Sequence, residues 1–196
     1  MENPFAYRLV QIPFTSRKLA PILDHNNTHE IRRVLDVGCG PGTNTAIFAG
    51  VDYLGMDINP DYIEQARRRF HRNFVVADVT QYRVSRDERY DFILVNSLLH
   101  HLPDDDVQNL LQHLSTLLAP DGYIHILELV LPEHPFFARK MAQWDRGEYT
   151  RPLAQWQSIF QSAFQNVLFE PYPVHVAGVE ALSMVYFKGC PKQSLM

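Results

Sequence analysis

Cysteine is scarce in this sequence, and long apolar runs are missing from it. The 196 residues contain two cysteines, Cys39 and Cys190, too few for a disulfide framework, and no Cys/His spacing typical of a zinc site occurs. No stretch approaches the roughly 20 apolar residues of a membrane-spanning helix. The opening residues, MENPFAYRLVQ, carry an acidic residue where a signal peptide carries positive charge. We therefore expect a soluble, cytoplasmic protein with no membrane segment and no metal.

An excess of positive charge is also missing. Lys and Arg total 18 against 22 Asp and Glu, which gives a formal net charge of −4. Nucleic-acid-binding domains are usually basic, and the densest basic stretch, ARRRFHR at 66–72, is typical of the solvated face of a helix. We therefore expect no nucleic-acid partner. The length and the 46% share of hydrophobic residues are typical of a single globular domain over residues 1–196.

What the sequence does contain is a regular alternation of strand-like and helix-like segments. Apolar patterns predict strands at residues 32–38, 52–58, 73–79, 91–97, 123–131, 166–172 and 181–187. Short helices are predicted at 43–49 and 60–70, a strong amphipathic helix begins at 104, and a core-facing helix covers 153–164. Strands that alternate with helices predict a parallel sheet, whereas the last two strands are too close for a helical crossover and should pair antiparallel.

Three glycines follow the first predicted strand at every second position, in VLDVGCGPGTN at 34–44. A Walker A loop needs a lysine that is missing here. The dinucleotide fingerprint GxGxxG needs a third glycine where Thr43 stands, which argues against a nicotinamide-dependent oxidoreductase. A tight strand-to-helix turn that serves only the fold is the simpler alternative.

Acidic residues stand at or near the ends of the first three predicted strands. Asp36 precedes the glycines, Asp57 follows 21 residues later, and Asp78 comes after the third strand. An acidic residue about 20 positions after the glycine loop is typical of hydrogen bonds to ribose hydroxyls. The carboxyl ends of parallel strands meet at one edge of a sheet, so the three carboxylates predict an adenosine-containing ligand there.

The motifs DVGCGPGTNT, GMDINPDYIEQARRRF, VVADV and YDFILVNSLLHHLPDDD, in this order, resemble those of class I S-adenosylmethionine-dependent methyltransferases. The resemblance covers residues 32–131. It implies a doubly wound, Rossmann-like α/β fold with a mostly parallel seven-stranded sheet whose last strand runs antiparallel, and S-adenosylmethionine as the cofactor. The implied cofactor-binding residues are Asp36, Gly38, Cys39 and Gly40 for the aminoacyl group and ribose, Asp57 for the ribose hydroxyls, Ile58, Asp78 and Val79 for the adenine, and Asn96 near the sulfonium.

Two histidines, His100 and His101, follow the fourth predicted strand, on the side where the methyl group would be delivered. Either one is a candidate catalytic base that removes a proton from the acceptor. The alternative is that HHLPD shapes the turn into the next helix. The acidic run at 104–106 could be read with these histidines as a metal site, but acidic residues in a first helical turn are favoured by the helix dipole.

Two segments are predicted to border the acceptor. Residues 1–31, with Tyr7, Val10 and Phe14 on one helical face, form an N-terminal helical cap that either closes over the cofactor or straps the back of the sheet. Residues 132–150 form an insertion near the acceptor site, with an apolar stripe of a kind that is more often ordinary core than the wall of a pocket.

The function predicted from these features is methyl transfer from S-adenosylmethionine to a small, apolar or aromatic acceptor by in-line displacement. Positioning two reactants in a dry site supplies most of the acceleration in such a reaction. The alternatives are a tRNA or protein methyltransferase and a cofactor-binding protein without catalysis. The acceptor, the atom methylated and the oligomeric state are left open.

Overall fold

The computed structural model describes residues 17–131, 148–176 and 179–192. The elements follow in the order α2 (Ala20–His25), β1 (Arg33–Val37), η1 (Thr45–Phe48), β2 (Asp52–Asp57), α3 (Pro60–Arg69), β3 (Asn73–Val76), η2 (Val79–Gln81), η3 (Arg86–Glu88), β4 (Tyr90–Asn96), η4 (Leu99–His101), α4 (Asp104–Leu117), β5 (Leu118–Leu129), α6 (Leu153–Ala163), β6 (Phe164–Val176) and β7 (Val179–Pro191), where η marks a 3-10 helix. All seven predicted strands are present.

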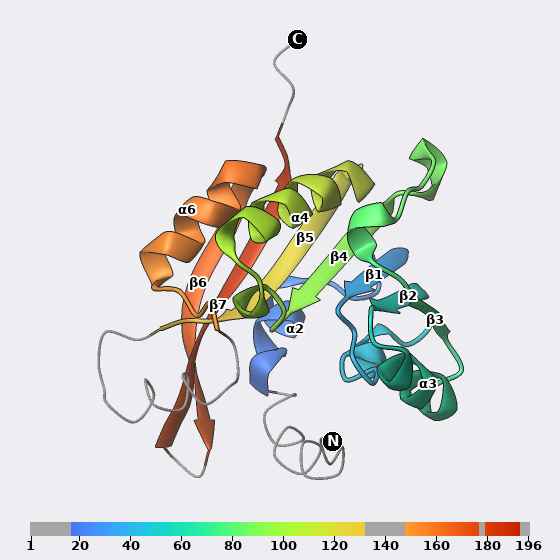
Figure 1. Ribbon diagram of the computed structural model, residues 1–196, viewed down its shortest axis with the longest axis horizontal. Helices are drawn as coiled ribbons and strands as arrows, with labels where there is room; N and C mark the ends of the chain where they lie inside the picture. Colours follow the sequence, from blue (N-terminus) through green and yellow to red (C-terminus); the bar gives the residue numbers. More distant parts are fainter. Residues whose placement is uncertain (1–16, 132–147, 177–178, 193–196) are drawn as a thin grey trace.

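One seven-stranded sheet with the order β3-β2-β1-β4-β5-β7-β6 forms the centre of the fold (Figure 1). Neighbouring strands from β3 to β5 are parallel, and β7 pairs antiparallel with both β5 and β6. The predicted Rossmann-like sheet with an antiparallel last strand is therefore confirmed. The strand order reverses between β1 and β4, the place where open α/β sheets form a crevice at the carboxyl ends of their strands.

Helices cover both faces of the sheet. The apolar stripes of α4 and α6 are buried on one face, where the two helices lie across β4–β7 in Figure 1. The predicted core residues Val107, Leu110, Leu111, Leu114, Leu117 and Leu118 of the first helical pattern, and Trp156, Ile159, Phe160 and Phe164 of the second, are all buried. Buried residues of α2, η1 and α3 form a second cluster on the opposite face. The periodicity in the sequence therefore predicted the layer of α4 and α6 correctly.

Local sequence explains where α3 begins. The side chain of Asn59 accepts hydrogen bonds from the backbone amides of Asp61 and Tyr62, and Pro60 occupies the first turn. An asparagine cap followed by proline satisfies the free amides of a helix start and fixes its first φ angle. The start of α3 in turn fixes the chain that follows β2, where the predicted ligand-binding residues Asp57 and Ile58 stand.

Several expected boundaries differ from the structure: β3 ends at Val76, before the expected residue 79, and β6 and β7 are longer than expected at both ends. The expected helix after the glycine loop is the single 3-10 turn η1, because only a few residues separate the loop from β2. β5 begins at Leu118, directly after α4, rather than at residue 123. No helix among the described residues is long and apolar enough to span a membrane.

Most of the two segments predicted to border the acceptor lies outside the described residues. The helical face of Tyr7, Val10 and Phe14, and most of the insertion at 132–150, fall there. The described part of the N-terminal segment packs against the sheet: Leu19 and Ile22 are buried, and the backbone carbonyl of Lys18 accepts a hydrogen bond from Tyr172. Residues 18–22 are thus anchored on the sheet face opposite α4.

Candidate functional site

A cavity of about 480 Å³ opens at the carboxyl ends of β1, β2 and β3. We name it the glycine-loop cavity, and its described lining residues are Val37, Gly38, Met56, Asp57, Ile58, Ala77, Asp78, Val79, Thr80, Leu98, Leu102, Asp106, Asn109 and Leu110. Five predicted cofactor-binding residues, Gly38, Asp57, Ile58, Asp78 and Val79, are in this set. The side chains predicted from three separate motifs are therefore brought together by the sheet.

Asp57, at the end of β2, is held by two backbone amides. Its Oδ2 accepts a hydrogen bond from the amide of Gly40 at 2.9 Å, and its Oδ1 accepts one from the amide of Asn59 at 2.8 Å. Gly40 has a φ of +53°, in the region that favours glycine, and this conformation aims its amide at the carboxylate. A carboxylate oxygen can accept more than one hydrogen bond, so Asp57 is fixed in place and still able to bind hydroxyl groups.

Gly38 leaves no space for a side chain. Its φ is +68°, and a Cβ atom at this position would lie 3.0 Å from a Leu98 methyl group. Leu98 itself lines the cavity. The glycine therefore lets the loop approach the turn after β4, and any larger residue would push Leu98 toward the cavity.

Two other lining residues are suited to a planar ring with an amino group. The Ile58 residue is 73% exposed although it is large and apolar, which leaves one face of it available. Asp78 caps η2, and its Oδ1 accepts hydrogen bonds from the amide and the hydroxyl of Thr80. These two bonds hold the pKa of Asp78 below its ordinary value, so the carboxylate is ionised at neutral pH and acts as an acceptor.

Asp36 lies outside the described lining of this cavity, within a buried polar network. It is fully buried and accepts hydrogen bonds from the Tyr53 hydroxyl at 2.7 Å and from Nδ2 of Asn44 at 3.1 Å. Burial raises the pKa of Asp36 to about 7, against the opposing effect of these hydrogen bonds. Asn96, predicted near the sulfonium, joins the same network by donating to Oδ1 of Asn44 at 2.9 Å.

Cys39 also points away from the glycine-loop cavity. Its side chain is buried in the cluster on the α3 face of the sheet. Burial raises the pKa of its thiol, so it is a packing group and not a nucleophile. Its backbone amide bonds the carbonyl of Met56 at 3.1 Å, which ties the glycine loop to β2.

The residue after Asn96 has an unusual backbone conformation. Ser97 has a φ of +55°, which is rare for a residue with a side chain and is often found at functional sites. Its hydroxyl lies 3.3 Å from Nζ of Lys18, a lysine that is only 6% exposed. The segment before α2 therefore brings a buried cation to the end of β4, a contact that no sequence pattern indicated.

His100, one of the two candidate bases, is paired with an acid that the sequence patterns did not single out. His100 and Glu128 are both buried, and Nδ1 of His100 lies 2.7 Å from Oε2 of Glu128. Oε1 of Glu128 accepts hydrogen bonds from the amides of Leu98 and Leu99. Burial opposes the ionisation of Glu128, but His100 and the two amides outweigh it and lower its pKa. His101 is exposed and its ring contacts that of His100.

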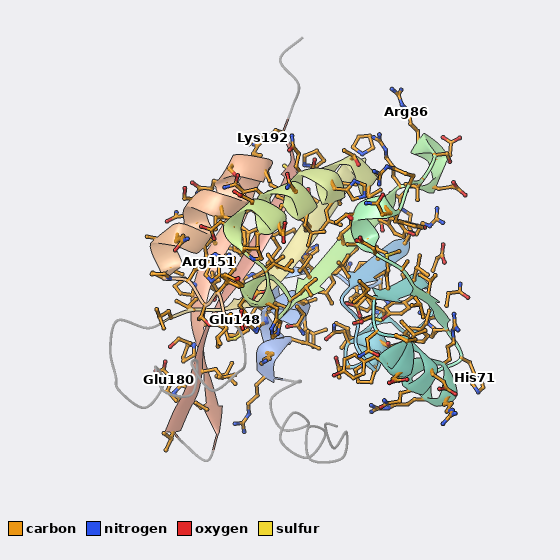
Figure 2. All side chains as sticks on the ribbon, in the orientation of Figure 1. His71, Arg86, Glu148, Arg151, Glu180 and Lys192 are labelled. Carbon is orange, nitrogen blue, oxygen red and sulfur yellow. The ribbon has the colours of Figure 1, made fainter. Side chains whose placement is uncertain are left out.

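A second residue without a sequence signal, Arg151, holds the same turn from the other side. Its guanidinium is buried and donates to the carbonyls of Leu99 and Leu102, at 3.2 and 2.7 Å, and to the Asp104 carboxylate at 2.6 Å. Figure 2 labels it near the start of α6. Glu128 thus binds amides of residues 98–99 and Arg151 binds carbonyls of residues 99 and 102, so the wall formed by Leu98 and Leu102 is fixed from both sides.

The acidic run at 104–106 forms the first turn of α4, and Asp104 is paired with Arg151. Across residues 17–131, 148–176 and 179–192, no group of histidine, cysteine and acidic residues is arranged to hold a metal ion. The place of this run in the first turn of α4 is the one that the helix-dipole interpretation expects.

A larger cavity of about 610 Å³ lies at the same edge of the sheet, beyond the end of β5. We name it the hairpin cavity, and its described lining residues are Val130, Leu131, Pro152, Leu153, Ala154, Gln157, Pro171, Tyr172, Pro173, Glu180, Ser183 and Met184. They come from the end of β5, the start of α6 and the β6–β7 hairpin. Most of them are apolar.

Comparison with known proteins agrees with this geometry. Residues 34–122 match a family model described as a methyltransferase domain. The chain is 34% identical over 137 residues to a trans-aconitate 2-methyltransferase of Methylobacterium radiotolerans, a match that covers 67% of this chain and 50% of that protein. An Escherichia coli protein of the same name is 32% identical over 124 residues, covering 61% of this chain and 46% of its own length. The chain therefore spans about half the length of these curated relatives.

Solved structures show the same fold. A structure described as S-adenosylmethionine-dependent methyltransferases from Methanosarcina mazei superposes on this chain with a TM-score of 0.72 at 17% identity. The match covers 88% of this chain and 98% of that one. The magnesium protoporphyrin IX methyltransferase of Synechocystis, solved with bound S-adenosylmethionine, gives a TM-score of 0.67 at 17% identity, covering 97% and 86%. Residues 34–122 are therefore those of a methyltransferase domain, and the chain has the fold of S-adenosylmethionine-dependent methyltransferases.

Proposed function

We propose that this chain transfers the methyl group of S-adenosylmethionine to a small-molecule acceptor, with the cofactor in the glycine-loop cavity. The observation that carries the proposal is the position of Asp57, whose two oxygens are fixed by the amides of Gly40 and Asn59 beside a cavity of about 480 Å³. A carboxylate fixed in this way binds a pair of ribose hydroxyls without losing further side-chain entropy.

The other lining residues complete a nucleoside site. Ile58 offers an apolar face for the adenine ring, Asp78 offers an ionised acceptor for its amino group, and Val79 lies next to Asp78 on the lining. Gly38 allows the ligand to lie directly against the backbone. We assign the remaining predicted residues, Asp36, Cys39, Gly40 and Asn96, to shaping and supporting the loop that receives the aminoacyl group.

Bound S-adenosylmethionine supplies an electrophilic methyl group that an acceptor lone pair can displace, leaving S-adenosylhomocysteine. The chain's own contribution is to place the acceptor in line and to exclude water. The Glu128–His100 pair fixes the turn that forms one wall of the cofactor cavity, so we assign His100 a positioning role. His101 stays a candidate base for acceptors that must lose a proton.

The hairpin cavity is the proposed acceptor site. Its volume lies within the 300–1,000 Å³ range of small-molecule sites, and its mainly apolar lining suits an apolar or aromatic body. The relatives named trans-aconitate 2-methyltransferase suggest a carboxylate acceptor as the second candidate.

Calorimetry tests the cofactor assignment. We expect the chain to bind S-adenosylhomocysteine and not NAD, and Asp57→Ala to weaken this binding by about 1.5–3 kcal/mol, the value of hydrogen bonds to a charged group. Asp61→Ala, which removes an exposed carboxylate from the first turn of α3, is the matched control and should leave the affinity unchanged. Affinity within twofold for folded Asp57→Ala protein would remove Asp57 from the site.

A further inference from the structure

The mainly apolar lining of the hairpin cavity includes one acidic side chain. Glu180, near the start of β7, lines the cavity and is half-buried. Its Oε1 accepts a hydrogen bond from the hydroxyl of Ser183 at 2.6 Å. Among the described residues, this hydroxyl is the partner that the structure gives Glu180, and no lysine or arginine is in the lining set. The cavity therefore presents a carboxylate with unused acceptor capacity.

The other polar groups of the lining do not offset this negative charge. The Tyr172 hydroxyl donates to the carbonyl of Lys18, so its ring forms the wall. Gln157 is neutral. Lys18, the buried cation at this edge, directs its ammonium group to Ser97 and is not part of the described lining. A ligand that brought another carboxylate into the cavity would meet Glu180 with no compensating cation among the described lining residues, which is unfavourable in a partly desolvated site.

The cavity is also placed to receive a molecule that reacts at the end of β4. The backbone amide of Val130, one of its lining residues, bonds the carbonyl of Ser183 at 2.8 Å. Val130 stands two residues after Glu128, which is about 7 Å along a strand. Glu128 in turn holds the amide of Leu98, which lines the glycine-loop cavity. The two cavities thus lie on either side of Glu128 and of the turn after β4 that it holds. Glu180 lies farther out, toward the end of the β6–β7 hairpin (Figure 2).

We propose that the hairpin cavity selects an acceptor with an apolar body and a protonated amine, and that Glu180 binds the amine. This inference rests on the proposed function, because it names the acceptor class of that reaction. Glu180 is a recognition residue and not a base: the ammonium group on Glu180 is distant from the reacting atom, which faces the end of β4. There a lone pair on a second nitrogen or an oxygen forms the bond to the methyl carbon, the carbon–sulfur bond breaks with its electron pair on sulfur, and the acceptor releases a proton to water.

A pair of matched probes tests the charge preference directly. Phenethylamine and hydrocinnamate share a phenyl ring on a short chain and differ in the sign of the terminal charge. Calorimetry with each probe, in the presence and absence of saturating S-adenosylhomocysteine, should show the amine binding at least about tenfold more tightly, as expected for one charge-assisted hydrogen bond.

Substitution of Glu180 then assigns the preference to this residue. Glu180→Gln keeps the shape and should reduce phenethylamine affinity about tenfold while leaving hydrocinnamate unchanged or improved. Glu180→Asp keeps the charge and should retain the preference for the amine. Glu170→Gln, on β6 of the same hairpin but paired with His25 outside the cavity, is the matched control and should behave as the unaltered protein.

Each outcome decides the inference. Equal or tighter binding of hydrocinnamate, no binding of either probe, or an amine-to-carboxylate ratio that Glu180→Gln leaves unchanged would overturn it. Protein that fails to bind S-adenosylhomocysteine contradicts the proposed function instead, and the probe ratio measured without it still decides whether Glu180 selects amines. Circular dichroism of each variant confirms that the fold is retained.

Discussion

The two cavities at the carboxyl edge of the sheet are built in different ways. Residues that line the glycine-loop cavity stand within a few positions of the ends of β1, β2 and β3, or on the turn and helix after β4. Asp57 and Asp78 each accept a hydrogen bond from the backbone amide two residues later, those of Asn59 and Thr80. The hairpin cavity instead combines remote segments, at 130–131 after β5, 152–157 at the start of α6, and 171–173 and 180–184 on the two strands of the hairpin.

This difference separates a kind of site that the fold itself provides from one that depends on the packing of this particular chain. A site made of local turns needs specific residues at fixed spacing, because the turn geometry itself positions the ligand. A site made of remote segments needs only that its walls be apolar and its few polar groups be placed by packing. Arg151 joins the two, since it holds the carbonyl of Leu102 beside one cavity and its own carbonyl binds the amide of Leu131 beside the other.

The largest expected effect is the loss of ligand binding in the glycine-loop cavity when Gly38 is replaced. Gly38→Val should abolish S-adenosylhomocysteine binding in calorimetry, a loss of at least about 100-fold, because the new side chain meets Leu98 and adopts a φ near +68°. Gly50→Val is the matched control: its φ is +79°, but nothing lies within 4 Å of an added Cβ. It should lose stability and keep its affinity. A Gly38→Val protein that unfolds outright would show that the glycine serves the turn.

A second, smaller effect concerns the acid beneath the glycine loop. Burial raises the pKa of Asp36 to about 7, so the folded protein keeps a proton that the unfolded chain releases near pH 4. Ionisation of Asp36 therefore lowers the stability of the folded protein. The part of the free energy of unfolding that depends on Asp36 falls as the pH rises above about 4 and levels off above about 7. We expect the free energy of unfolding to decline by about 2.5 kcal/mol between pH 5 and pH 8 from this group.

Carboxyl-carbon NMR, with Asp36→Asn used to assign the signal, measures this titration directly. A midpoint near pH 4 would mean that the hydrogen bonds from Tyr53 and Asn44 outweigh burial. Repeating the titration with S-adenosylhomocysteine tests the predicted contact with the aminoacyl group, because a ligand amine close to Asp36 would lower the midpoint.

The smallest expected effect reaches both cavities at once. Arg151→Met should lower the free energy of unfolding by about 2 kcal/mol, because the carbonyls of Leu99 and Leu102 lose their donor. It should also weaken both S-adenosylhomocysteine and phenethylamine by a few fold, since one wall of each cavity loosens. Arg32→Met, which removes an exposed arginine paired with Asp91 and Asp121, is the control and should change little. Loss of affinity for one ligand alone would contradict the linking role of Arg151.

The glycine-loop cavity was predictable from the sequence to a large extent. Strand periodicity located β1, β2 and β3, and the residues at their ends, Gly38, Asp57, Ile58 and Asp78, line one cavity as expected. Asp36 shows the limit of this reasoning. Alternation along a strand gives the face on which a side chain lies only when the strand is half-exposed, and β1 is buried on both faces. The Asp36 carboxylate is directed to Tyr53 and Asn44 rather than to the cavity.

Glu128 and Arg151 were not predictable, because neither belongs to a motif. Glu128 lies within an apolar strand, and its partners are the amides of residues 98 and 99, about thirty positions earlier. Arg151 binds carbonyls about fifty positions earlier. Contacts of this range form only after β4 and β5 have paired and α6 has packed against the sheet.

The sequence by itself determined the strands of the sheet, the helical layer of α4 and α6, and the loop where the cofactor is proposed to bind, because each depends on spacing within a few residues. The tertiary structure decided which groups support that loop and what the second cavity presents to an acceptor. Glu180 is the proposed recognition group only because of its place in the hairpin, with Ser183 on one side and apolar walls from α6 and β5 on the other. The reason is physical: hydrogen-bond geometry in a turn is local, whereas burial and charge balance depend on every segment that packs around a group.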